Sequence, residues 1–211
     1  LCKETVLAEA LRCKHCGAEL AQYEKLQQLE SRLRVSTDKE QSKVIEELTR
    51  LGEIAVPLLI QTLQDNSNPV GQIDAAFALA ELRDPRAFWP LVNALKSKDR
   101  TIVEMVALAL GDFGDTRAVP HLIAALRDDP SSTGVTSALM KLNDPSAIPG
   151  LVDFLAHCLS LVGESMASEA IEHFGSQAAP VLVEAYRTAR PAKKSILAYT
   201  LSQTGPAAVP A

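Results

Sequence analysis

The stretch GDFGDTRAVPHLIAALRDD, residues 111–129, combines the end of one apolar segment, a turn and the start of another. Asp115 lies in the turn, where an aspartate side chain can accept backbone N–H bonds. Pro120 follows, and proline is tolerated in the first turn of a helix because its missing N–H would have no intrahelical partner there. Leu122, Ile123 and Leu126 then recur at helical spacing. The stretch therefore predicts a helix, a tight turn and a second helix.

The same pattern recurs along the chain. Prolines at 57, 90, 120, 149, 180 and 210 are separated by 33, 30, 29, 31 and 30 residues. Asp84 and Asp144 precede two of them as Asp115 does, and glycines at 52, 111, 114, 175 and 205 are expected to end helices with positive φ. A hairpin of about 30 residues cannot bury its apolar face alone, so neighbouring hairpins must stack. The period predicts an all-α fold, an α-solenoid of helical hairpins with five units and the start of a sixth over residues 37–211.

The amino-acid composition and the net charge limit the kinds of protein that this chain can be. Hydrophobic residues make up 47% of the chain and aromatic residues 4%, so the core must consist mostly of Leu, Ile, Val and Ala. The net charge of −5 argues against a general nucleic-acid binder. No apolar run reaches the roughly 18 residues that span a bilayer, and no signal peptide is recognisable, which favours the cytoplasm. Because residue 1 is Leu, a targeting segment could precede it.

The quoted stretch resembles the short HEAT-like repeat that is also known from phycobilisome lyases, and the resemblance extends over roughly residues 37–211. Repeats of that family often carry Val-Arg at the start of the first helix, whereas this chain has Val70-Gly71 and Ile102-Val103 there. An Asp-x-Arg element is retained at Asp84 and Asp115, but Ser146 replaces the arginine in the fourth unit. We interpret this element as a structural brace between repeats.

The resemblance implies that the second helix of each unit lines a concave face that binds a protein or peptide. The polar residues expected there carry both charges and amides, which suits a protein better than a polyanion. They are Gln61, Gln64, Asn93, Lys96, Arg127, Asp153, Glu184 and Arg187.

The sequence shows no constellation of catalytic groups. Gly163-Glu164-Ser165-Met166-Ala167 lacks the last glycine of a nucleophile elbow. His121, His157 and His173 fall in separate units, and Cys158 is expected to be buried. The prediction is therefore a scaffold without enzymatic activity. A lyase-like or chaperone-like factor acting on a chromophore-carrying protein is one alternative, and nucleic-acid handling through an N-terminal zinc ribbon is another.

Three of the four cysteines lie near the N-terminus, at Cys2, Cys13 and Cys16. A C-x-x-C turn followed by glycine is typical of a zinc knuckle, and tetrahedral zinc requires two such pairs. Residues 1–19 therefore resemble a zinc ribbon cut inside its first knuckle, with His15 or water as the fourth ligand if structural zinc binds. Redox chemistry and no special role remain as alternatives.

Residues 20–36 are expected to form a linker or a capping helix, or a helix that pairs with another chain. The chain also stops at Val209-Pro210-Ala211, where a further second helix should start. Both ends therefore suggest a segment of a longer solenoid. The oligomeric state stays open.

Overall fold

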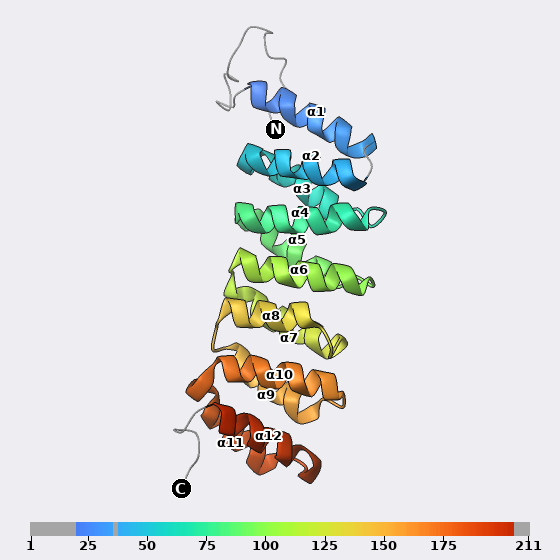
Figure 1. The fold of residues 1–211 in the computed structure, drawn as a ribbon. Coiled ribbons are helices and arrows are strands. Elements are labelled where there is room, and N and C mark those ends of the chain that lie inside the picture. Colours follow the sequence, from blue (N-terminus) through green and yellow to red (C-terminus); the bar gives the residue numbers. More distant parts are fainter. Residues whose placement is uncertain (1–19, 36–37, 205–211) are drawn as a thin grey trace. The chain divides into compact units, whose positions relative to one another are not determined.

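The computed structural model describes residues 20–35 and 38–204. Figure 1 shows that this part of the chain is all-α, with short 3₁₀ turns between helices. The fold is the predicted solenoid of stacked helical hairpins. The α-helices are α1 (Leu20–Val35), α2 (Asp38–Leu51), α3 (Val56–Leu63), α4 (Pro69–Leu82), α5 (Phe88–Ala94), α6 (Arg100–Phe113), α7 (Val119–Asp128), α8 (Thr133–Leu142), α9 (Ala147–His157), α10 (Leu161–His173), α11 (Ala179–Thr188) and α12 (Pro191–Gln203).

The chain divides into two compact units, the first ending at Ala87 and the second beginning at Phe88. In the first unit, α2 packs against α1 and α4, and α4 also packs against α3. Leu29 and Leu33 of α1 are buried, and Lys25 pairs with Glu47 of α2 at 3.1 Å. The helix over residues 20–35 thus lies on the first repeat.

In the second unit, the first helices α6, α8, α10 and α12 contact one another in that order, and so do the second helices α7, α9 and α11. Large aliphatic side chains such as Leu110, Leu122, Leu139 and Leu151 are fully buried between them. Each helix has one apolar face, so the core is a continuous layer between the two rows of helices.

Aspartates form the predicted turns between the helices of a repeat. The Oδ1 atoms of Asp84, Asp115 and Asp144 accept the backbone N–H two residues further on, at 2.9, 3.0 and 2.8 Å. The hydrogen bonds lower the pKa of all three carboxyls, mainly through the Arg86 side chain, the Arg117 side chain and Ser146 respectively. The negative form of each side chain therefore stabilises its turn.

The ends of the first helices use left-handed backbone in several ways. Gly52, Gly114 and Gly175 have positive φ, as predicted, but in two repeats Arg83 and Asn143 adopt it instead. Gly111 lies inside α6 rather than at its end. A Cβ there would lie 3.0 Å from Cα of Ala138, so Gly111 allows α8 to approach α6 closely.

Two predictions from the sequence fall outside the described residues. Cys2, Cys13, Cys16 and His15 belong to residues 1–19, so the zinc ribbon and its structural zinc stay predictions. The start of a sixth repeat in residues 205–211 lies outside as well. Among the residues described, none of the helices is long and apolar enough to cross a membrane.

Candidate protein-binding surface

The second helices of the repeats expose a polar face. All eight residues predicted to bind a partner are exposed; six lie on second helices as predicted, and Gln64 and Lys96 lie just after the ends of α3 and α5. Gln61 and Gln64 belong to the first unit, where they line a groove of about 370 Å³ together with Leu33 of α1. The other six belong to the second unit. We call their surface the second-helix face, and it consists of Asn93, Lys96, Arg127, Asp153, Glu184 and Arg187.

Charged residues of the second-helix face are partly paired with each other. Arg127 of α7 donates to Asp153 of α9 at 2.6 Å, which joins two neighbouring repeats. Glu184 and Arg187 of α11 form an ion pair at 3.5 Å. Exposed ion pairs of this kind contribute little to stability, so the charged groups of both pairs remain available to a partner. Lys96 and Arg127 lie on the earlier repeats of the face and Asp153 on α9, while α11 carries both Glu184 and Arg187.

Trp89 of α5 was not among the predicted site residues. Its side chain is 57% exposed, and its ring packs edge-on against His121 of α7 with the ring centres 5.7 Å apart. Trp89 follows Asp84 by five residues, as Pro120 follows Asp115. The residue that replaces the usual proline is therefore Trp89, one position before Pro90. Counting from the aspartates instead of the prolines would have revealed it. Exposed tryptophans often dominate binding energy at protein interfaces.

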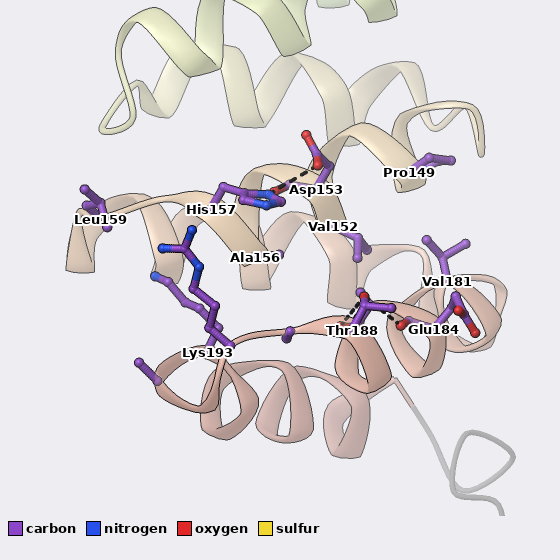
Figure 2. Close-up of a pocket in the computed structure, with 14 residues that line it drawn as sticks. Pro149, Val152, Asp153, Ala156, His157, Leu159, Val181, Glu184, Thr188 and Lys193 are labelled. Carbon is purple, nitrogen blue, oxygen red and sulfur yellow. Dashed lines mark hydrogen bonds and ion pairs between the residues drawn. The ribbon is translucent and has the colours of Figure 1, made fainter.

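A groove of about 680 Å³ lies between α9 and α11 and reaches the start of α12. Small apolar side chains line it, including Val152, Ala156, Val181 and Ala185. Figure 2 shows Leu159 and His157 at one end, and Pro149 and Val181 at the other. Asp153 and Glu184 of the second-helix face line the same groove. The predicted site residues on α9 and α11 are therefore brought together, on opposite walls of one groove.

Lys193 of α12 also lines the groove, where it is largely buried and pairs with Glu164 of α10. Its ammonium group also donates to the carbonyl oxygen of Cys158. The lysine and glutamate side chains are only 11% and 19% exposed. Buried charges are tolerated when they are paired and hydrogen bonded, so this pair holds α10 and α12 to the end of α9.

The histidines and Cys158 make separate local contacts. His121, His157 and His173 lie on different helices, and Nδ1 of His157 bonds the carbonyl oxygen of Asp153 at 2.9 Å. Cys158 is buried as predicted, and its thiol is hydrogen bonded locally to the backbone of Ser160. Among the described residues, no group of three or more metal-ligating side chains forms.

The repeats match a known family. Residues 56–137 match the family model described as HEAT repeats. The match covers the repeats from α3 into α8. The phycocyanobilin lyase subunit alpha of Synechococcus elongatus is 32% identical over 98 residues, which is 44% of this chain and 36% of that protein. The match thus spans about a third of the length of this curated relative. The predicted resemblance to the repeats of phycobilisome lyases is confirmed.

Two solved structures have a similar arrangement of helices. The complex of CpcE and CpcF of phycocyanin lyase from Nostoc sp. PCC7120 matches with a TM-score of 0.54 and 20% identity, over 93% of this chain and 92% of that one. Human deoxyhypusine hydroxylase in complex with glycerol matches with a TM-score of 0.49 and 17% identity, over 88% and 75% of the chains. The first likeness supports the solenoid fold.

The comparisons correct one prediction from the sequence. We expected a protein without enzymatic activity because no catalytic constellation is recognisable. That expectation is wrong, because the curated relative that shares these repeats is a lyase subunit. The error came from searching for single motifs. A solenoid distributes polar groups over many repeats, so an enzyme subunit of this fold need not contain a compact motif.

Proposed function

We propose that this chain is a lyase-like factor that binds a chromophore-carrying protein through its second-helix face. The observation that carries the proposal is the identity of 32% between its repeats and phycocyanobilin lyase subunit alpha. The HEAT repeats provide the scaffold, and protein partners are the usual ligands of such surfaces. The structurally similar chain comes from a phycocyanin lyase complex, which agrees with a protein partner.

The chemistry of the second-helix face fits a protein. The mixture of Lys96, Arg127 and Asp153 with the amide of Asn93 allows paired contacts of both signs. The net charge of −5 gives no general attraction to nucleic acids. Trp89 adds a large amphipathic side chain that a partner can cover. We therefore assign the role of the face to recognition of the acceptor protein, with phycocyanin as the first candidate.

Binding is the first measurement. The chain is immobilised, and phycocyanin without its chromophore is titrated over it by biolayer interferometry. We expect saturable binding that weakens at least tenfold when Asn93, Lys96 and Arg127 are changed to alanine together, because several polar contacts are lost at once. The matched control changes three exposed residues of first helices, Glu81, Ser165 and Glu169, to alanine and should bind normally.

Attachment of the chromophore is the second measurement. Phycocyanobilin and the acceptor are incubated with and without the chain, and covalent product is followed by fluorescence of the denatured acceptor on a gel. We expect more product with the chain present, and less with the triple variant. Absence of both binding and increased attachment would overturn the proposal.

A further inference from the structure

The segment between α9 and α10 exposes three aliphatic side chains. Leu159 is 94% exposed, Leu161 82% and Val162 53%. We call these three residues the apolar lip. The corresponding segments of three other repeats are mostly polar, namely residues 67–70 (Ser-Asn-Pro-Val), 98–101 (Lys-Asp-Arg-Thr) and 131–134 (Ser-Ser-Thr-Gly), and each exposes at most one large aliphatic side chain, Val70. Contiguous exposed aliphatic residues are unfavourable in water and often mark a contact site. The lip is thus a local departure from the repeat.

Leu159 of the apolar lip also lines the groove between α9 and α11. Along α9, Pro149, Asp153 and His157 follow at one-turn intervals and Leu159 comes next. Along α11, Val181, Glu184 and Thr188 follow in the same way, and Arg190 comes next. Figure 2 shows the same order, with Leu159 and His157 at one end and Pro149 and Val181 at the other. The groove therefore has four zones in sequence: an apolar zone at Leu159, a cationic zone at Arg190, an acidic zone at Asp153 and Glu184, and an apolar zone at Pro149 and Val181.

This order has a geometric consequence. Read from the opposite end, the zones are apolar, acidic, cationic and apolar. When the groove of a second, identical chain is turned by 180° and placed against the first, the acidic zone of each chain faces the cationic zone of the other. The apolar zone at Pro149 and Val181 then faces the apolar lip. Such self-complementarity is what a two-fold symmetric contact between identical chains requires.

The charges in the groove are only partly satisfied within one chain. Within the described part of the chain, Arg190 has no ion-pair or hydrogen-bond partner for its side chain. Asp153 and Glu184 are exposed, with side-chain exposures of 51% and 68%, so each can accept a further bond. The unpaired guanidinium of Arg190 can pair with an accessible carboxylate of a second chain, and such a pair favours the antiparallel orientation.

We propose that a second copy of this chain docks on the groove in antiparallel orientation and forms a two-fold symmetric dimer. Arg190 of each chain pairs with Glu184 of the other, and the apolar lip of each chain covers the zone of Pro149 and Val181 of the other. The dimer requires neither the chromophore nor the acceptor protein. Its test therefore needs neither of them, although the dimer covers Asp153 and Glu184, the two residues of the second-helix face that line the groove.

The oligomeric state is measured by analytical ultracentrifugation of the 211-residue chain from about 1 to 200 µM, a range chosen because small interfaces associate weakly. We expect the mass to rise with concentration from 22.7 kDa towards twice that value. A chain that stays monomeric over the whole range overturns the proposal and leaves the groove to another ligand.

The apolar lip is tested with a matched pair of variants. Val162 and Val70 both occupy the second position of a first helix, in α10 and α4, and both are exposed. A glutamate in the first turn of a helix interacts favourably with the helix dipole, so Val162→Glu and Val70→Glu should both fold. We expect Val162→Glu to weaken dimerisation at least tenfold and Val70→Glu to leave it unchanged. Equal effects of the two variants, or none, would contradict the assignment.

The orientation is tested by exchanging charges. Arg190→Glu and Glu184→Arg should each weaken the dimer at least tenfold, because like charges then face each other across the contact. The double variant restores opposite charges in both pairs and should dimerise like the original chain. A mixture of the two single variants should also associate. A double variant that is weaker than both single variants excludes the antiparallel contact.

Discussion

The guanidinium carbon of Arg117 lies 4.3 Å from the centre of the Phe88 ring. Arg117 belongs to the turn before α7, and Phe88 begins α5 in the preceding repeat. The same guanidinium donates to both carboxylate oxygens of Asp115, with Nε at 3.0 Å from Oδ1 and Nη2 at 2.5 Å from Oδ2. The Asp-x-Arg element is thus a brace between repeats, as predicted. In the first unit, Arg86 does the same by donating to the carbonyl oxygen of Glu53 at 3.1 Å.

A double-mutant cycle should isolate this brace. Phe88 is fully buried, and Phe88→Leu should lower the free energy of unfolding by about 1 kcal/mol or slightly more, because most of the apolar volume is kept. Arg117→Ala should be destabilising in the original chain but clearly less so in the Phe88→Leu background, since the ring contact is already gone. Urea unfolding followed by circular dichroism measures the cycle. Additive effects would show that ring and guanidinium do not interact energetically.

The turn aspartates should make stability depend on pH. Hydrogen bonds to Arg86, Arg117 and Ser146 hold the pKa values of Asp84, Asp115 and Asp144 below the ordinary aspartate value. Groups with a lowered folded-state pKa contribute stability that is fully present above the unfolded pKa of about 4 and is lost as the pH falls through the folded pKa. We therefore expect stability to fall below about pH 4. Changing all three residues to asparagine should lower stability at neutral pH and flatten the acid limb of the profile.

Gly134 should not tolerate a side chain. It lies in the first turn of α8, and an added Cβ would lie 2.4 Å from the backbone oxygen of Glu104 in α6. Alanine would normally improve helix propensity by about 1 kcal/mol, but here α8 would have to move away from α6. We expect Gly134→Ala to destabilise the chain by about 1–3 kcal/mol in thermal or urea unfolding. Ser137→Ala, in the same helix and only partly exposed, should change stability little. A stabilised Gly134→Ala variant would contradict the close approach of the two helices.

The solenoid could be predicted from the sequence because its determinants are local. Asp115 and Pro120 specify a turn and a helix start within six residues, and that pattern repeats. The positive φ of Arg83 and Asn143 could not be predicted, since the C-terminal cap accepts several residue types when the backbone makes the bonds.

The candidate site was predictable only in part. Asp153 and Glu184 lie on the polar sides of their helices, and the sequence of each helix alone is enough to predict that they are exposed. The groove between them depends on how α9 and α11 pack, and the pairing of Lys193 with Glu164 joins residues 29 positions apart. Such contacts depend on the stacking of two repeats, which no local pattern encodes.

The pair formed by Lys193 and Glu164 should be strongly coupled. Removing one partner leaves the other charge buried without compensation, so Lys193→Met and Glu164→Gln should each lower the free energy of unfolding by about 3 kcal/mol. The double variant removes both charges and should be no less stable than the single variants, which gives a large coupling energy. Urea unfolding at neutral pH measures all four proteins. Arg50 and Glu46 form an exposed pair on α2, and the same cycle there should give about 0.5 kcal/mol or less. Equal coupling energies for the two pairs would mean that burial between α10 and α12 does not strengthen the contact, and that the base of the groove is open to water.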